Sequence, residues 1–451
     1  MRPVLAMTLV AALVGFATNA AAQMDSPPDG FTALFNGEDL AGWKGLVGNP
    51  ETRAAMAPEE LANAQADANA AIAEHWRVEE GVLINDGHGP HLCTEKQYGD
   101  FELLIDWKIS PGADSGIYLR GAPQVQIWDP VNGIDQARVG SGGLYNNQNH
   151  PSRPLVVADN PAGEWNTFRI RMIGEIVRVE LNDALVVDEV VMENYWDRSR
   201  PIYPREQIEL QTHGGEIAFR NIFIREISVD EANEWLTARS GPPRDFKPLF
   251  NGRDLDGWTG SVDGYLVENG ALICDPERGG TLLTEEEFGD FVLAFQFKLP
   301  PGGNNGLAVR APLQGNPAYD GMELQILDNT SPKYAMLQPY QYHGSIYGVA
   351  AAHRGYLRPV GEWNFQEVTL DGSKVIVRLN GTTITEVDLD EIETPMDGNE
   401  HPGLERTSGH IGFMGHGDRV EFRDIRIRPL RGSRGAPDAG EDAKEPEPSI
   451  R

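Results

Sequence analysis

Cysteine, positive charge and long hydrophobic runs are all scarce in this chain of 451 residues. Two cysteines cannot form a disulfide framework; we expect Cys93 and Cys274 to be buried free thiols, with a bridge between domains as the alternative. The 38 Lys and Arg residues face 68 Asp and Glu residues, so the net charge is −30. Such a surface repels phosphate backbones and anionic lipids, which argues against nucleic-acid binding and membrane-surface attachment. No segment after the N-terminal region is apolar over the ~20 residues that span a bilayer.

The first 22 residues have the pattern of a secretory signal. Arg2 precedes an apolar run over residues 4–16, and Ala20 to Ala22 form a small-residue end. A membrane anchor is disfavoured because it would need ~20 apolar residues. The sequence therefore predicts cleavage after Ala22 and a periplasmic or extracellular protein.

The chain contains two copies of one sequence. The matching segments are residues 31–43 (FTALFNGEDLAGW) and 246–258 (FKPLFNGRDLDGW), 98–101 (YGDF) and 288–291 (FGDF), 163–166 and 361–364 (GEWN), and 219–222 (FRNI) and 422–425 (FRDI). This many matches in one order indicate a tandem duplication.

Domain boundaries follow from the duplication. We predict a first domain over residues 30–228 and a second over residues 245–430, joined by a helix and a Pro-rich linker at residues 229–244. The offset between matching motifs falls from 215 to 190, so the first copy has about 25 extra residues. We assign them to a helical insertion in the Ala-rich stretch 50–74. Residues 431–451 are rich in Pro, Gly and acids, which predicts a disordered tail.

Segments within each copy alternate apolar and polar residues, as half-buried strands do. Residues 101–107 (FELLIDW) and 177–181 (VRVEL) are examples, and Asn380-Gly381 predicts a hairpin turn. Few helical patterns interrupt the copies. The sequence therefore predicts an all-β protein of two tandem double-sheet sandwiches, with a short helical insertion in the first copy.

Several predicted strands carry polar side chains at matching places in the two copies. Alternation in residues 322–328 (MELQILD) puts Glu323 and Gln325 on one face, and Gln124 and Gln126 occupy these positions in the first copy. The other candidates are Asp114, Arg120, Asp129, Tyr145, Asn146 and His213 in the first copy, and Asn304, Arg310, Asp328, His343, Tyr347 and His416 in the second. Planar polar groups beside aromatic rings are typical of a carbohydrate-binding groove.

These motifs resemble the 3-keto-disaccharide hydrolase family. The resemblance rests on LFNGxDLxGW, [DN][SN]G[IL]xxR, [EQ]xQIxD, GEWN and a late His-Gly, and it covers residues 30–226 and 245–429. It implies a concanavalin-like jelly-roll fold and action on glycosides oxidised to a ketone at sugar carbon 3. It also implies a secreted or periplasmic location, and a separate sugar 3-dehydrogenase upstream that oxidises the sugar.

The implied chemistry fits the residue types in the second copy. A ketone at carbon 3 acidifies the proton on carbon 2, so a base can remove it and the anomeric substituent can leave; water then adds to the product. We expect Glu323 or His416 to be the base, Arg310 the electrophilic partner of the enolate oxygen, and Gln325 a sugar contact. A divalent metal held by the ketone and its neighbouring hydroxyl is an alternative, although no tight metal-ligand spacing is present.

The first copy departs from this pattern because Gln124 replaces the acid and cannot act as a base. The sequence therefore favours the second copy as catalytic and the first as substrate-binding. Structural roles are also open: Arg120 and Arg310 can pair with carboxylates, Asp129 and Asp328 can cap turns, and the two His-Gly pairs can lie in turns.

Two classes of function remain. The first is a secreted carbohydrate-active enzyme that cleaves 3-keto-glycosides, and the second is a non-catalytic sugar-binding or wall-associated protein on the same fold. Convergence of the polar set on one cavity favours the enzyme, and dispersal over a flat surface favours the binding protein. Neither a serine-hydrolase triad motif nor a nucleotide-binding glycine pattern occurs in the required context.

Overall fold

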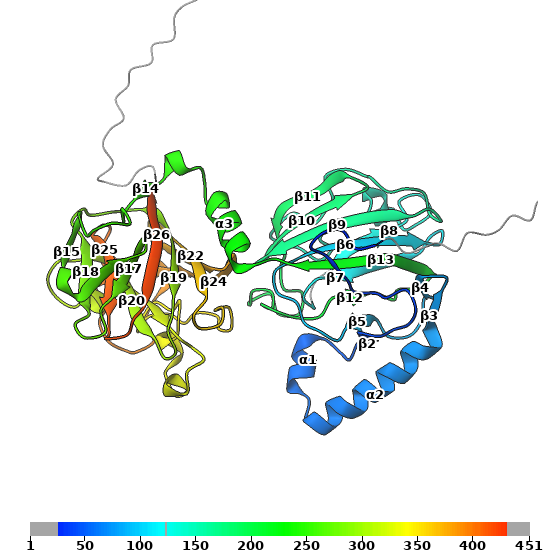
Figure 1. The fold of residues 1–451 in the computed structure, drawn as a ribbon, viewed down its shortest axis with the longest axis horizontal. Coiled ribbons are helices and arrows are strands. Elements are labelled where there is room, and N and C mark those ends of the chain that lie inside the picture. Colours follow the sequence, from blue (N-terminus) through cyan, green and yellow to red (C-terminus); the bar gives the residue numbers. More distant parts are fainter. Residues whose placement is uncertain (1–25, 122–123, 431–451) are drawn as a thin grey trace, which may run out of the picture.

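The computed structural model describes residues 26–121 and 124–430. The predicted signal peptide at residues 1–22 and the predicted tail at residues 431–451 lie outside these residues. The described chain forms two β-sandwiches joined by the helix α3 (Val229–Arg239), and Figure 1 shows them as two lobes with α3 between them.

The first sandwich has two antiparallel sheets within the described residues. The larger runs β11-β10-β9-β6-β13-β4-β3 with β1 paired to β13: β1 (Thr32–Ala33), β3 (Trp76–Glu79), β4 (Val82–Asn85), β6 (Phe101–Ile109), β9 (Asn166–Ile173), β10 (Ile176–Leu181), β11 (Ala184–Val191) and β13 (Ile217–Glu226). The smaller runs β2-β5-β12-β7-β8: β2 (Trp43–Gly45), β5 (Leu92–Thr94), β7 (Asp114–Tyr118), β8 (Gln124–Trp128) and β12 (Glu209–Leu210).

The second sandwich repeats this strand order. Its larger sheet runs β24-β23-β22-β19-β26-β17-β16 with β14 paired to β26: β14 (Lys247–Pro248), β16 (Tyr265–Glu268), β17 (Ala271–Cys274), β19 (Phe291–Lys298), β22 (Trp363–Asp371), β23 (Lys374–Leu379), β24 (Thr382–Asp388) and β26 (Glu421–Pro429). Its smaller sheet runs β15-β18-β25-β20-β21: β15 (Trp258–Gly260), β18 (Gly280–Thr284), β20 (Asn304–Ala311), β21 (Met322–Leu327) and β25 (His410–Gly415). Two copies of one topology confirm the predicted all-β tandem fold.

The predicted helical insertion is present in the first copy. It consists of α1 (Pro50–Ala55), whose N-terminus is capped by Asn49, and α2 (Pro58–His75), which begins at a proline. The helix α2 packs closely on β2 at Gly45, where a Cβ atom would lie 2.5 Å from the Ala68 carbonyl oxygen. A short helix, α4 (Pro317–Asp320), occurs in the second copy. The short 3-10 helices are η1 (Asp135–Val139), η2 (Pro243–Asp245), η3 (Val262–Gly264), η4 (Pro332–Tyr334), η5 (Pro339–Gln341), η6 (Leu389–Glu391) and η7 (Pro402–Glu405).

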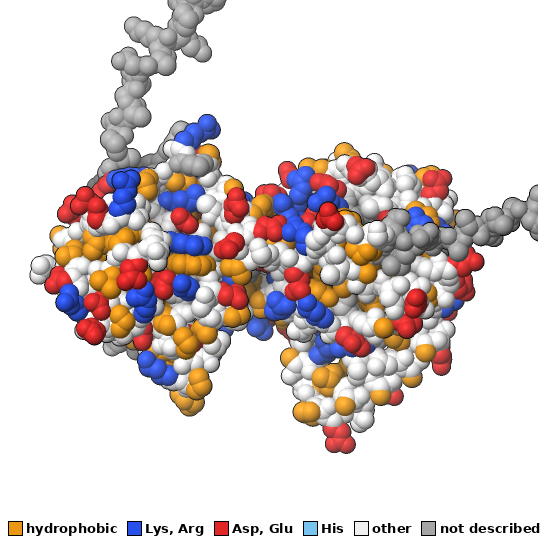
Figure 2. Space-filling model, viewed as in Figure 1, with side chains coloured by type: hydrophobic (Ala, Val, Ile, Leu, Met, Phe, Trp, Pro, Cys, Tyr) orange, Lys and Arg blue, Asp and Glu red, His pale blue; other side chains and the backbone are white. Residues whose placement is uncertain are grey.

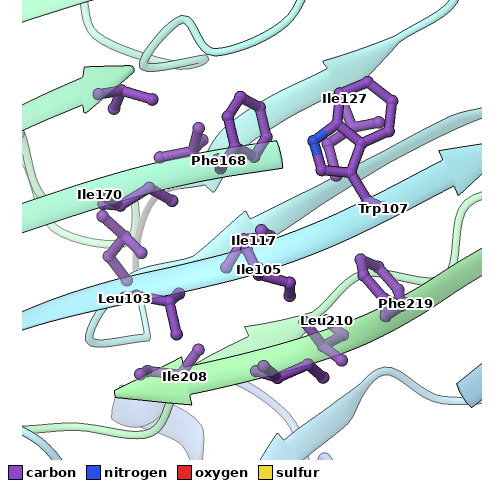
Figure 3. Close-up of a cluster of buried hydrophobic side chains, with 14 of the residues drawn as sticks. Leu103, Ile105, Trp107, Ile117, Ile127, Phe168, Ile170, Ile208, Leu210 and Phe219 are labelled. Carbon is purple, nitrogen blue, oxygen red and sulfur yellow. The ribbon is translucent and has the colours of Figure 1, made fainter. Parts of the chain in front are cut away.

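The core of each sandwich lies between its two sheets. Alternate residues of β6, such as Leu103, Ile105 and Trp107, point into this space in the first copy, and Figure 3 shows them opposite Ile117 and Ile127 of the smaller sheet. Period-two alternation therefore places the apolar residues inside, as predicted. Cys93 and Cys274 are both buried and unpaired.

The two sandwiches contact each other directly. Thr383 donates a hydrogen bond of 2.8 Å to the buried carboxylate of Glu175, and Arg358 donates one of 2.6 Å to Asn233 of α3. An apolar cluster around Leu236 of α3 and Phe246 contains residues of both copies. Charged side chains of both signs gather where the lobes meet (Figure 2). Among the described residues, no helix has the length and apolar character to cross a membrane.

Candidate active site

The polar face of β21 lines a cavity in the second copy. Met322, Leu324 and Ile326 point into the core, so Glu323 and Gln325 face the other way. The cavity has a volume of about 320 Å³. Its walls contain Asn304, Glu323, Gln325, Tyr347 and His416, which the sequence predicted, together with Asn316, Ala318, Tyr319, Leu327, Tyr334, Leu337, Gln341 and Met414. Five candidates from two strands and two loops thus converge on one space.

Glu323 is a buried acid in this cavity. Only 4% of the residue is exposed, and its Oε1 atom has no hydrogen-bond partner among the described residues. Burial raises the pKa of its carboxyl group to about 7. A carboxyl group of that pKa can take up and release a proton near neutral pH, as a general base must.

A glycine makes room for this carboxyl group. Glu323 is paired with Ala308 of the neighbouring strand β20, and its side chain extends over Gly306, where a Cβ atom would be 2.1 Å from Glu323 Oε1. The same relation occurs in the first copy, where a Cβ atom on Gly116 would be 2.8 Å from Gln124 Cγ. The Asp/Asn-Ser/Asn-Gly motif therefore needs glycine at its third position, because a larger residue would collide with Glu323 or Gln124 of the neighbouring strand.

His416 and Asn304 line the same cavity as this acid. His416 is exposed, yet desolvation by the surrounding protein lowers the pKa of its imidazole, against the opposing effect of Asp418. The Asn304 backbone N–H donates a hydrogen bond of 3.1 Å to the Asp418 carboxylate. The side-chain oxygen of Asn304, Oδ1, has no hydrogen-bond partner within the described chain. A neutral imidazole and a free amide oxygen are both available to a ligand.

Amide and aromatic groups form the remaining walls. Gln325 uses its Oε1 to accept a hydrogen bond of 3.0 Å from the Ile326 N–H, which leaves its Nε2 donors for the cavity. Gln341 donates a hydrogen bond of 3.1 Å to the Tyr347 hydroxyl. Tyrosine rings beside amide groups match the faces and hydroxyls of a sugar.

Three predicted residues of the second copy lie away from the cavity and correct the sequence-based expectation. Arg310 is buried and donates hydrogen bonds of 2.9 Å to both Asp290 and the Gly372 carbonyl. Asp328 caps a turn by accepting hydrogen bonds from Gly302 N–H and Thr330. His343 is buried in the core with its ring stacked 5.0 Å from that of Phe297.

The displacement of Arg310 has a definite cause. Strict alternation would put Arg310 on the same face as Asn304 and Gly306, but the register of β20 with β25 shifts between Ala308 and Ala311. Arg310 also has a φ of 48°, in the left-handed region. This irregularity turns the side chain away from the cavity to Asp290.

In the first copy, the matching polar residues bond to one another. Gln126 donates to Asp114 at 2.6 Å, Gln124 donates to Gln126 at 2.8 Å, and His213 Nδ1 lies 3.3 Å from Asp114. The Tyr145 ring meets the Trp128 ring edge-on at 5.7 Å. The side chains that would bind a sugar are thus largely committed to each other.

The other first-copy candidates lie outside this network. Arg120 is buried, has a φ of 52°, and donates a hydrogen bond of 3.0 Å to the Pro204 carbonyl. Asp129 caps a turn by accepting from Gly112 N–H at 2.9 Å. The Asn146 carbonyl accepts a hydrogen bond from Arg198. Asp129 therefore has the turn-capping role that was its alternative. Arg120 also has a structural role, but its partner is a backbone carbonyl and not the carboxylate that the alternative gave it.

Sequence reasoning missed a second buried acid, Glu209 of β12. Burial raises the pKa of its carboxyl group to about 8, and its Oε1 has no hydrogen-bond partner among the described residues. It stands beside Tyr118 on the face that carries Gln124. The sequence signal for Glu209 was a polar residue between the two apolar residues Ile208 and Leu210. A strand of two residues is too short for this alternation to predict which face Glu209 occupies.

Tyr319 and Gln341 of the cavity were also missed. The second copy has nine more residues between Asn304 and Glu323 than the first has between Asp114 and Gln124, and Tyr319 lies in this extra segment. The change in spacing was the only sequence signal. Within the described residues, no group of three or more His, Cys, Asp and Glu side chains is arranged to hold a metal ion.

Comparison with known proteins matches both copies. The profile of the family described as "3-keto-alpha-glucoside-1,2-lyase-like domain" matches residues 30–225 and again residues 245–428. A relative from Bacteroides thetaiotaomicron named 3-keto-disaccharide hydrolase is 25% identical over 224 residues, which cover 40% of this chain and 77% of the relative.

Two solved structures from Parabacteroides distasonis, both provisionally described as glycosyl hydrolases, are also similar. One is 30% identical with a TM-score of 0.38, and the match covers 41% of this chain and 99% of that one. The other is 22% identical with a TM-score of 0.37, and the match covers 42% of this chain and 98% of that one.

Proposed function

Because the chain belongs to the family of 3-keto-alpha-glucoside-1,2-lyase-like domains, in two tandem copies, we propose that it cleaves glycosides oxidised to a ketone at carbon 3. Family membership and the name of the Bacteroides relative support a carbohydrate-active enzyme. The substrate and the mechanism proposed below rest on the second-copy cavity. We also propose that the protein is secreted, from the signal pattern in residues 1–22.

The single observation that carries the proposal is the state of Glu323. Its carboxyl group is buried in an open cavity, has an unpartnered oxygen within the described chain, and has a pKa of about 7. The corresponding Gln124 is hydrogen-bonded to Gln126 and has no acid–base capacity. The second copy is therefore the better candidate for catalysis.

Glu323 as base accounts for the first step. Its carboxylate takes the proton from carbon 2, and the electron pair moves into the enolate of the carbon 3 ketone. We assign the stabilisation of that oxygen to the Nε2 donors of Gln325, in place of Arg310. Collapse of the enolate expels the substituent from carbon 1, and water then adds at carbon 1 while Glu323 returns the proton to carbon 2.

The ordinary hydrolytic route needs two carboxyl groups on either side of the glycosidic bond. Among the described cavity-lining residues, Glu323 is the acidic side chain, and the others are Asn, Gln, Tyr, His and apolar residues. This composition supports elimination next to a ketone over an oxocarbenium route. A divalent metal on the ketone remains compatible with the proposal and is tested below.

The test compares a 3-keto-disaccharide with its unoxidised parent, with and without a chelator. We expect cleavage of the keto-sugar alone, abolished in Glu323→Gln and retained in the matched first-copy variant Gln124→Ala. Loss of activity on chelation would add a metal to the site. Cleavage of neither sugar would refute the enzymatic proposal in favour of a binding protein, and loss in Gln124→Ala alone would move catalysis to the first copy.

A further inference from the structure

A hydrogen-bonded group of three side chains stands behind one wall of the second-copy cavity. Tyr319 lines the cavity, and its hydroxyl donates a hydrogen bond of 3.3 Å to Asp397 Oδ2. His401 Nε2 lies 3.2 Å from both oxygens of the same carboxylate. The His401 ring also stacks on the Tyr319 ring, with 4.5 Å between centroids.

This group is almost closed to solvent on the side away from the cavity. The side chains of His401 and Asp397 are 1% and 6% exposed. Asp397 also accepts hydrogen bonds of 2.9 and 3.0 Å from the N–H and side chain of Asn399. A buried carboxylate with these donors stays ionised, and accordingly its pKa lies below the usual value despite burial.

Two glycines allow the backbone to pack closely around the Asp397–His401 pair. Gly348 follows the cavity residue Tyr347 with a φ of 75°, and a Cβ atom there would lie 2.6 Å from Asp397 Oδ2 and 2.7 Å from His401 Nε2. The 3-10 helix η7 approaches the end of α4 so closely that a Cβ atom on Gly403 would be 1.9 Å from the Gly321 carbonyl oxygen. Two glycines thus permit the contact between the loop that carries the pair and the helix that carries Tyr319.

The second copy alone combines this tyrosine with the acid. The nine additional residues between Asn304 and Glu323 supply α4 and Tyr319, and the same copy has Glu323 where the first has Gln124. The base of the proposed reaction and the inserted tyrosine therefore occur together.

We propose that Tyr319 donates the proton to the leaving glycosidic oxygen, and that Asp397 and His401 are positioning residues that orient its hydroxyl. This rests on the proposed function, which needs an acid for that oxygen as well as the base Glu323. Burial first, and Asp397 second, raise the pKa of the Tyr319 hydroxyl, so it carries its proton at neutral pH.

The proton and electron balance is complete within the cavity. As the enolate collapses, the bond between carbon 1 and the glycosidic oxygen breaks, and its electron pair leaves with the oxygen. The Tyr319 hydroxyl gives up its hydrogen bond to Asp397, and its proton is transferred to the leaving oxygen. The incoming water then gives one proton back to Tyr319 and its hydroxyl to carbon 1, while Glu323 returns its proton to carbon 2.

The test is the dependence of the rate on the leaving group in the full chain. We expect Tyr319→Phe to slow cleavage of a 3-keto-disaccharide, whose sugar leaving group needs a proton, by about 10²–10⁴-fold. A 3-keto p-nitrophenyl glycoside has a leaving group that departs without a proton, so the same variant should slow it by less than about tenfold. Asp397→Asn and His401→Asn should show the same selective pattern, with smaller losses.

Tyr334→Phe is the matched control, because Tyr334 also lines the cavity, but its hydroxyl donates to the Gly302 carbonyl at 3.0 Å and not to a carboxylate that is paired with a histidine. It should change both substrates by the same factor. An equal loss for the two substrates in Tyr319→Phe would overturn the inference and leave the proposed function intact, because a merely structural tyrosine affects both alike. Failure of the wild type to cleave either substrate would refute the proposed function itself.

Discussion

Replacing Glu323 with Gln should make the second domain more stable and inactive at the same time. Burial raises the pKa of the Glu323 carboxyl group from 4.5 to about 7, so the folded state holds this proton more tightly than the unfolded state does. Wild-type stability therefore falls as pH rises from about 4.5 to about 7 and is lower by roughly 3 kcal/mol above that range, at 1.36 kcal/mol per pKa unit. Glutamine has nearly the same shape and never ionises, so it avoids this loss.

The expected signature is a pH-dependent shift in melting temperature. At pH 4 the variant and the wild type should melt together, whereas at pH 9 the second-domain transition of the variant should be higher by about 6–12 °C, given ~2–4 °C per kcal/mol for a domain of this size. Scanning calorimetry at the two pH values measures this directly. Cleavage of a 3-keto-disaccharide by the same samples should fall by about 10²–10⁴-fold.

Glu209→Gln is the matched control in the first domain. Its carboxyl group is also buried with a pKa of about 8, so the variant should gain stability above pH 8 while cleavage is retained. The reasoning is refuted if Glu323→Gln changes the melting temperature equally at pH 4 and pH 9, because the carboxylate would then not be destabilised by burial. It is also refuted if cleavage survives.

Two further predictions test the geometry of the second copy, one at Gly306 and one at Arg310. Gly306→Ala should displace the Glu323 carboxyl group and lower kcat at least tenfold, with little change in melting temperature. The equivalent variant in the first copy, Gly116→Ala, should leave cleavage unchanged. Equal rates for Gly306→Ala and wild type would contradict the close contact between Gly306 and Glu323. Arg310→Gln should lower the free energy of unfolding by about 3 kcal/mol, by removing the buried partner of Asp290, but leave kcat/KM of the folded protein unchanged. A selective loss of kcat with normal stability would return Arg310 to the active site.

Much of the fold could be predicted because it depends on local, periodic features. Alternation with period two depends only on the pleat of a strand, so Met322 to Leu327 were placed correctly on two faces. The Asn380-Gly381 turn was predictable for a similar reason: both residues adopt positive φ, which these two types tolerate. The helical insertion was evident from its alanine content and the changed spacing between the copies.

The candidate site could be predicted only in part. Glu323, Gln325, Asn304, Tyr347 and His416 were found because they recur at matched places along the two copies. Arg310 recurs in the same way, as Arg120, yet in both copies a residue with positive φ turns the guanidinium away from the polar face. Recurrence alone does not separate a residue retained for packing from one retained for a ligand.

The sequence by itself determined the duplication, the two sandwiches and which face of each strand is polar, because these depend on residue order and a period of two. Tertiary structure alone decided which polar residues share an open cavity. In the first copy, tertiary packing joins the polar residues to one another by hydrogen bonds, such as that between Gln126 and Asp114. In the second copy, it brings Asp397 and His401 from a distant loop to Tyr319. Loops have no period to read, and whether a side chain meets a neighbour or an empty space is decided only when the sheets and loops pack.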